Sequence, residues 1–164
     1  MKKVILTLLC IGFLILDNTL LPFFAINTFY PSILFVFALC YSIVNDKWDA
    51  LGIGVFSGLL QDIYFFQGFG VNALVNMVVC LIASYVGESI FKEKKLVPVI
   101  TTFFLSILKY ILVFGILFIT KTKTHIQGAI YVGPLSMILA FFMYKWVYRL
   151  SQKSYMKKDW KFNE

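Results

Sequence analysis

The sequence predicts an all-α integral membrane protein, a compact bundle of six transmembrane helices joined by short loops. Of its 164 residues, 60% are hydrophobic and 14% are charged, whereas a soluble domain carries about 25% charged residues. The apolar residues form long continuous runs, as in membrane helices, and do not alternate with polar residues as in the strands of a membrane barrel. No polar segment is long enough for a soluble domain, so we expect one polytopic membrane domain over residues 1–164.

Six apolar runs define the expected spans. They cover residues 4–24, 29–44, 48–66, 70–89, 96–120 and 126–148, and a basic tail follows at residues 149–164. Asp17 and Asn18 interrupt the first run, which resembles a signal peptide without a cleavage site and is therefore expected to remain as a helix. The second run starts at Pro31, a residue favoured in the first turn of a helix. It is shorter than the about 20 residues that cross a bilayer, so we expect it to include residues before Pro31, to tilt, or to be partly re-entrant.

The basic residues predict the orientation. With six spans both termini share one side, and that side holds twelve of the fifteen lysine and arginine residues. The other side holds Lys121 and Lys123, and Lys109 lies inside the fifth run. Because short cytoplasmic loops are rich in lysine and arginine, both termini are expected in the cytoplasm. The net charge of +7 therefore indicates orientation and contact with membrane lipid, and nucleic acid is not an expected partner.

The stretch from Gly52 to Leu74 contains the densest pattern of small and polar residues. Gly54, Gly58 and Asp62 recur every four residues and share one face of a helix. Glycines at this spacing let a neighbouring helix approach closely. The candidates for helix packing or partner contact in this region are Gly54, Ser57, Gly58, Asp62, Gly68, Gly70, Asn72 and Asn76. Among them, Gly68 and Gly70 are expected to reverse the chain, and Asn72 is placed to cap the next helix.

Three ionisable residues lie deep in the predicted spans. Counting about 1.5 Å per residue from the cytoplasmic ends, Asp17, Asp62 and Lys109 all lie about 20 Å deep and could form one layer. Such residues usually face the protein interior. We therefore expect Lys109 to pair with Asp62 or Asp17. The alternative is that Lys109 extends to the interface and both acids lie at the outer surface.

The sequence contains no catalytic, metal-binding or nucleotide-binding motif, and no enzyme activity or cofactor is expected. The single histidine, His125, lies in a polar loop, and the three cysteines lie in separate apolar runs without a CxxC pair.

The run Gly54-x-x-x-Gly58-Leu59-Leu60-Gln61-Asp62, followed by Gly70-x-Asn72-Ala73-Leu74, resembles the signature of the MreD family, the bacterial rod shape-determining membrane proteins. The length of the chain, its short loops, Pro31 and the basic ends fit the same family. The family's usual Gly-Leu-Gly-like turn is Gly68-Phe69-Gly70 here.

The resemblance implies a non-catalytic scaffold in the bacterial cytoplasmic membrane. Such a protein helps maintain cell shape by organising lateral peptidoglycan synthesis in the cell-elongation complex through helix–helix contacts. The implied partners are MreC and, through it, the actin-like MreB, the RodA glycosyltransferase and a class B penicillin-binding transpeptidase.

Two other functions remain open from the sequence. One is a substrate-binding subunit similar to the S component of an energy-coupling-factor vitamin transporter, with an outward pocket lined by Asp62, Asn72 and Asn76. The other is an ion-coupled carrier that uses Asp17, Asp62 and Glu88.

Overall fold

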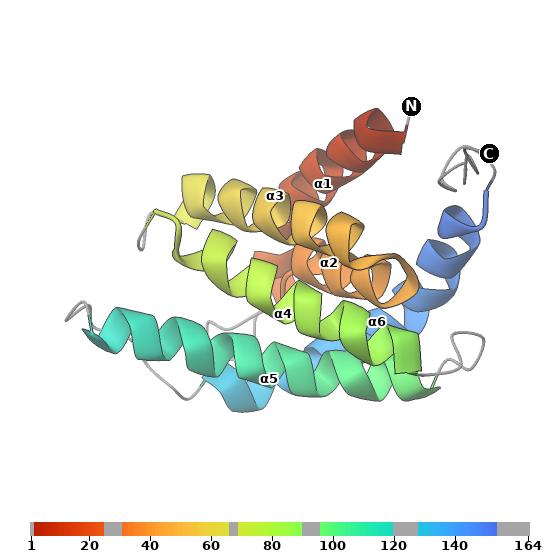
Figure 1. The fold of residues 1–164 in the computed structure, drawn as a ribbon. Coiled ribbons are helices and arrows are strands. Elements are labelled where there is room, and N and C mark those ends of the chain that lie inside the picture. The colour runs from red at the N-terminus through yellow and green to blue at the C-terminus, as the bar shows by residue number, and fades with distance from the viewer. Residues whose placement is uncertain (1, 25–30, 66–68, 90–95, 120–127, 154–164) are drawn as a thin grey trace.

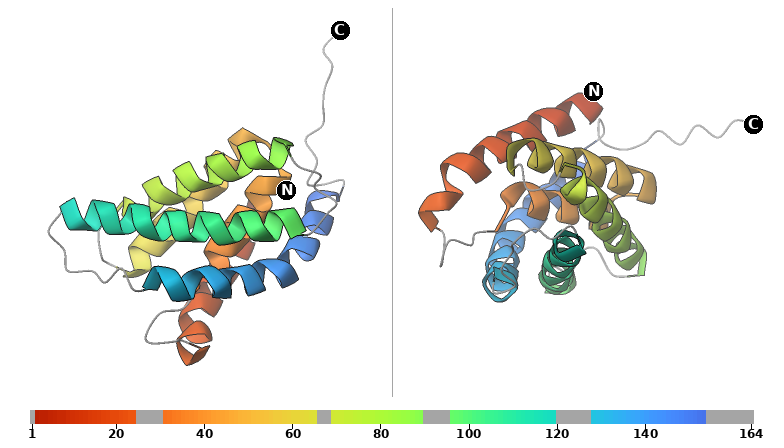
Figure 2. Two further views of the ribbon diagram at one scale, coloured as in Figure 1. Left: turned by 90° about the horizontal axis from the view of Figure 1, so that it is seen from below. Right: turned by 90° about the vertical axis from the view of Figure 1, so that its left-hand side faces the viewer.

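The computed structural model describes residues 2–24, 31–65, 69–89, 96–119 and 128–153, and every element in these ranges is a helix. The elements are α1 (Lys2–Thr19), the short 3-10 helix η1 (Leu21–Phe24), α2 (Ile33–Val44), α3 (Lys47–Phe65), α4 (Val71–Ser89), α5 (Leu96–Ile119) and α6 (Gly128–Ser151). The helices alternate in direction. The first residues of α1, α3 and α5 and the last residues of α2, α4 and α6 therefore gather at one edge of the bundle (Figures 1 and 2).

α2 forms the centre of the bundle. Every residue of this helix after Ile33 is buried, and α2 packs against all five of the other α-helices (Figure 2). Its 12 residues extend about 18 Å at 1.5 Å per residue, less than the about 30 Å of a bilayer core. α2 is therefore a short apolar helix whose first turn lies buried inside the bundle.

The predicted start of the second helix is wrong. Pro31 precedes the helix, and Ser32 is its N-cap, with the Ser32 hydroxyl accepting a hydrogen bond from the Phe35 backbone N–H. A serine side-chain oxygen accepts a hydrogen bond from an N–H group of the first turn. Proline is compatible with the backbone angles of that turn but offers no such acceptor. Residues 29 and 30 of the predicted span lie outside the described residues.

α1 lies at the periphery, and only Cys10 and Asp17 of this helix are buried. Asp17 and Asn18 interrupt the apolar run of the sequence, but α1 continues through both residues to Thr19. The Asn18 side chain donates to the Leu14 carbonyl, and the Asp17 side chain reaches α2. Neither polar side chain therefore breaks the helix.

α3 and α4 approach each other at backbone distance along the glycine face. A Cβ atom added at Gly58 would overlap the backbone of Asn72 and Ala73, and one added at Gly54 would lie 2.9 Å from the Asn76 carbonyl oxygen. On α4, Gly87 meets the backbone of Ile43 in the same way. Small residues at such crossings allow the close packing that membrane helices use.

Two of the described helices, α4 and α5, are long and apolar enough to cross a membrane, and α2 is a shorter apolar helix. Large apolar side chains also cover the outside of the bundle. On α5 they include Ile100, Phe104, Ile111 and Phe118. An apolar surface of this extent suits a lipid environment, since water would disfavour it.

Candidate functional site

Asp17 of α1 binds the first turn of α2. Its carboxylate accepts hydrogen bonds from the Ile33 N–H at 2.6 Å, the Leu34 N–H at 3.2 Å and the Ser32 hydroxyl at 2.6 Å. The first N–H groups of a helix lack partners within the helix, and the helix dipole favours a negative charge there. Asp17 therefore ties the buried start of α2 to α1.

Asp62 of α3 has the same role at the start of α4. Its carboxylate accepts hydrogen bonds from the N–H groups of Gly70, Asn72 and Ala73 at 2.9–3.0 Å. Gly70 has a φ of 95°, in the left-handed region that glycine adopts without strain. Gly68, the other predicted turn glycine, lies outside the described residues.

The predicted capping role of Asn72 is wrong. α4 begins at Val71, so Asn72 is already inside the helix. Its side-chain amide instead donates to Asp62 at 3.1 Å. The carboxylate, with two oxygens and a negative charge, takes the N–H groups for which the Asn72 side chain would otherwise compete.

Gln61, which is not among the predicted site residues, joins the polar groups of four helices. Its amide nitrogen donates to the Ser32 hydroxyl at 2.7 Å. Its amide oxygen accepts from Asn76 on α4 at 3.0 Å and from the Lys109 ammonium on α5 at 2.8 Å. In the sequence, Gln61 could have been recognised as an amide side chain within an apolar run, directly before Asp62.

The predicted ion pair of Lys109 is wrong. The Lys109 ammonium contacts the Gln61 oxygen and lies 4.0 Å from the centre of the Phe35 ring. In the described part of the chain, the ion pairs are Lys2–Asp49 and Lys47–Glu88. The carboxylates of Asp17 and Asp62 are instead occupied by helix N–H groups, which leaves Lys109 to interact with them over a longer distance.

With Asp17, Asp62 and Lys109 all ionised, the formal charges of the buried layer that these residues form with Gln61 balance. Two carboxylates and one ammonium sum to a single negative charge, and each helix N-terminus contributes about +0.5. The N-termini of α2 and α4 together therefore offset the remaining charge. Lys109 contributes its positive charge to this balance without direct contact with either acid.

The layer brings together most of the predicted site residues. Asp17, Gln61 and Lys109 belong to one hydrogen-bonded chain that also includes Asn76, whose amide nitrogen lies 3.3 Å from the Ser57 hydroxyl. The Asn76 oxygen is buried without a hydrogen bond. Gly54 and Gly58 lie directly beside this chain, in contact with the backbone of α4. The layer thereby connects all helices from α1 to α5.

The residues expected to line a transporter-like pocket are engaged within the bundle. Asp62 and Asn72 bond to each other, and Asn76 is fully buried between Gln61 and Ser57. Glu88, one of the acids proposed for an ion-coupled carrier, forms an ion pair with Lys47 at 3.1 Å.

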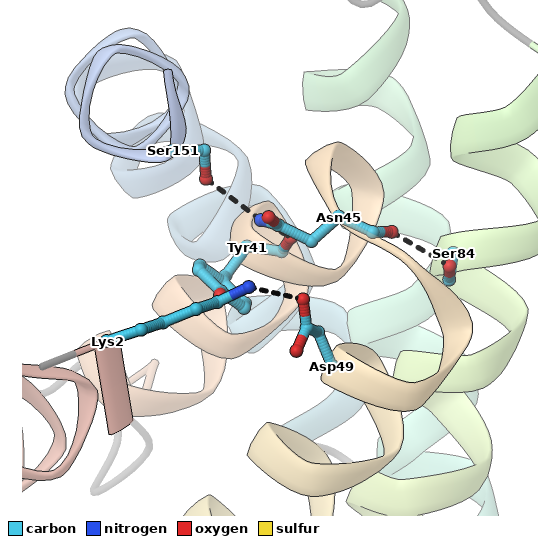
Figure 3. Close-up of polar contacts among 6 residues, drawn as sticks. All are labelled: Lys2, Tyr41, Asn45, Asp49, Ser84 and Ser151. Atoms are coloured by element: carbon cyan, nitrogen blue, oxygen red, sulfur yellow. Dashed lines mark hydrogen bonds and ion pairs between the residues drawn. The ribbon is translucent and has the colours of Figure 1, made fainter. Parts of the chain in front are cut away.

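A second polar cluster holds the helix ends at the edge where α1 begins (Figure 3). The Asn45 side chain donates to the Tyr41 carbonyl at 2.9 Å and to the Ser151 hydroxyl of α6 at 2.8 Å. The Ser84 hydroxyl of α4 donates to the Asn45 carbonyl at 3.1 Å. Beside them, Lys2 of α1 pairs with Asp49 of α3 (Figure 3). Asn45 and this ion pair thus fasten α1, α2, α3, α4 and α6 at one edge.

Both clusters use their polar groups to hold helices together. Among the residues that the structure describes, no group of three histidine, cysteine or acidic side chains could hold a metal ion. His125 lies outside the described residues. The arrangement can therefore fix helix positions and orient an outer surface.

A family model described as rod shape-determining protein MreD matches residues 1–154 of the chain. No curated protein and no solved structure matches the chain.

Proposed function

Because the chain belongs to the MreD family of rod shape-determining proteins, we propose that it is a non-catalytic membrane scaffold of the cell-elongation complex. In this role it organises lateral peptidoglycan synthesis by binding MreC through helix–helix contacts. MreC in turn connects it to MreB, to the RodA glycosyltransferase and to a class B penicillin-binding transpeptidase.

The observation that carries this proposal is the use of the buried polar groups. Asp17, Asp62 and Gln61 all bond to backbone or side-chain groups of neighbouring helices. A substrate site would instead need polar groups that converge on an open cavity. The layer supports a rigid bundle, which a scaffold needs to hold partner proteins in a defined arrangement.

We further propose six spans with both termini in the cytoplasm of the bacterial cell. The alternating helices support this arrangement, because α1 begins and α6 ends at one edge (Figure 1), and the sequence concentrates lysine and arginine in the segments at that edge. The described lysine and arginine residues of that edge are Lys2, Lys3, Lys47, Lys145, Arg149 and Lys153. The short α2 then extends from that edge to the buried layer and contributes a partial crossing.

The partner helix is expected to bind α1. The Gly54/Gly58 face is covered by α4 and leaves no room for a partner. α1, in contrast, exposes Val4, Leu8, Ile11 and Ile15. On the same helix Gly12 is exposed and has no neighbouring atom within 4 Å of an added Cβ. A partner helix could therefore approach α1 closely at Gly12.

Photo-crosslinking in cells tests this proposal. A photo-reactive residue in place of Leu8 should capture MreC. The same residue in place of Ser57, which is buried at the α3–α4 contact, should give only products within the chain, and it serves as the matched control. Capture of a transporter ATPase at Leu8, or of MreC at Ser57 but not at Leu8, would contradict the proposed function or its docking face, respectively.

A further inference from the structure

The outer face of the second half of α6 combines apolar and cationic side chains. Ile138, Phe142 and Trp146 recur every four residues and are 56%, 72% and 45% exposed. Lys145 and Arg149, on the same side of the helix, are also exposed. Lys145 and Arg149 lie in the last two turns of α6, whose end belongs to the edge where the helix ends gather, and Ile138 and Phe142 lie nearer the middle of the helix.

The two cations of this face are not neutralised by described acids. At the same edge, Lys2 pairs with Asp49, and Lys47 pairs with Glu88 while lying 4.2 Å from the centre of the Tyr85 ring. Lys145 and Arg149 form no ion pair in the part of the chain that the structure describes. Among the described residues, the end of α6 therefore presents two positive charges without an acidic partner, on the same side of the helix as the exposed rings of Phe142 and Trp146.

The Trp146 ring of this face packs against two other helices. It lies 6.1 Å from the Phe13 ring of α1 and 6.3 Å from the Phe37 ring of α2, between ring centres. Tryptophan favours the boundary between lipid headgroups and acyl chains. These contacts tie Trp146 to α1 and α2, next to Lys145 and one turn before Arg149 on α6.

We infer that this face of α6 binds one acidic phospholipid at the cytoplasmic surface of the membrane. The lipid phosphate lies between Arg149 and Lys145, and one acyl chain lies along Trp146, Phe142 and Ile138. The planar guanidinium group of arginine can donate two parallel hydrogen bonds to a phosphate, and the lysine ammonium adds a second positive charge. Charge complementarity favours an anionic headgroup, and the apolar side chains directly below exclude a purely polar ligand such as nucleic acid. The inference rests on the proposed orientation but on no protein partner.

Quenching of Trp146 fluorescence by brominated lipids tests the site. The full-length variant W48F/W160F keeps Trp146 as its only tryptophan and is reconstituted in bilayers of brominated phosphatidylglycerol or brominated phosphatidylcholine mixed with unbrominated lipid. Each cation is expected to favour the acidic lipid by about fivefold, which corresponds to about 1 kcal/mol per charge near the surface. The preference should decrease as salt is added.

Charge-removing variants separate the site from a general surface effect. K145Q and R149Q should each reduce the preference about fivefold, with quenching by phosphatidylcholine unchanged. K47Q is the matched control, because Lys47 lies at the same edge but is paired with Glu88, and it should leave the preference intact. An unchanged thermal unfolding midpoint shows that each variant is folded.

Four results would overturn the inference. The first three are equal quenching by both lipids, a preference that survives in K145Q/R149Q, and loss of the preference when inorganic phosphate is added at constant ionic strength. Absence of quenching by either lipid would also overturn it, because protein would then cover Trp146. Quenching by phosphatidylcholine without an acidic preference would remove the lipid site but retain the membrane placement of α6 on which the proposed function depends.

Discussion

Asp17 and Asp62 occupy corresponding places in two successive helix pairs. Each lies near the end of one helix, and each accepts backbone hydrogen bonds from the first turn of the next helix, α2 or α4. Inside a membrane, water cannot satisfy those N–H groups, and an unsatisfied group costs several kcal/mol. Asp17 therefore allows α2 to begin inside the bundle, and Asp62 satisfies the first N–H groups of α4 near the opposite edge.

The role of Lys109 can be tested by exchanging charges. A directly paired Lys109 and Asp62 would tolerate the double variant K109D/D62K. We expect no rescue here, because a lysine in place of Asp62 cannot accept the N–H groups of α4. K109M should lower the free energy of unfolding by about 2 kcal/mol, as expected for loss of a hydrogen bond to a charged group. Adding D62N to K109M should restore part of this loss by returning the layer toward neutrality.

Unfolding of the purified variants in detergent micelles, followed by circular dichroism, measures these differences. If K109D/D62K is more stable than both single variants, the net charge of the layer outweighs the hydrogen bonds that Asp62 accepts from the α4 N–H groups. If D62N worsens K109M, hydrogen bonding by the second Asp62 oxygen outweighs the balance of charge.

At the scale of helices, the α3–α4 pair depends on the absence of a side chain at two positions. Gly58 contacts the α4 backbone, whereas Gly12 of α1 and Gly52 of α3 have no atom within 4 Å of an added Cβ. The same residue type therefore has different roles along the chain. Backbone approach at Gly58 also brings Asp62 within reach of the first turn of α4.

Alanine substitution distinguishes these glycines. G58A should lower the free energy of unfolding by about 2–3 kcal/mol, since the added methyl group forces the two backbones apart. G52A, on the same helix, should leave stability unchanged or raise it by up to about 1 kcal/mol through its higher helix propensity. The midpoint of thermal unfolding in one detergent compares the two variants. Equal midpoints for both would show that α3 and α4 do not cross at Gly58.

Several features of the helices and the polar layer could be predicted from the sequence. Helical periodicity placed Gly54, Gly58 and Asp62 on one face, and counting residues placed Asp17, Asp62 and Lys109 at one depth. The hydrogen-bond partners could not be predicted. The N–H of Ile33 lies 16 residues after Asp17, whereas that of Asn72 lies only 10 residues after Asp62. The number of residues between an acid and the helix that it caps is therefore not fixed. For Asp17, the packing of α1 across α2 determines which N–H groups the carboxylate reaches.

For the whole molecule, polar contacts divide into two levels. One is the buried layer around Gln61, and the other is the edge cluster around Asn45 (Figure 3). Both ends of α1 are held, since Lys2 pairs with Asp49 at the edge and Asp17 bonds to α2 in the layer. Between the two levels the outer surface is apolar, as the proposed contacts with lipid and partner helices require.

Cysteine labelling in intact cells tests the orientation of the whole bundle. Trp48 lies at the cation-rich edge, Phe69 lies in the turn before α4 at the opposite edge, and both side chains are exposed. In a background where the three buried native cysteines are replaced by alanine, F69C should react with a membrane-impermeant maleimide from outside the cell. W48C should react only after the membrane is permeabilised. Reaction of W48C in intact cells, with F69C protected, would invert the bundle, and reaction of both would mean that α3 does not cross the membrane. The expected pattern follows because twelve of the fifteen cations would otherwise have to lie on the outer side, against the charge bias that orients membrane helices.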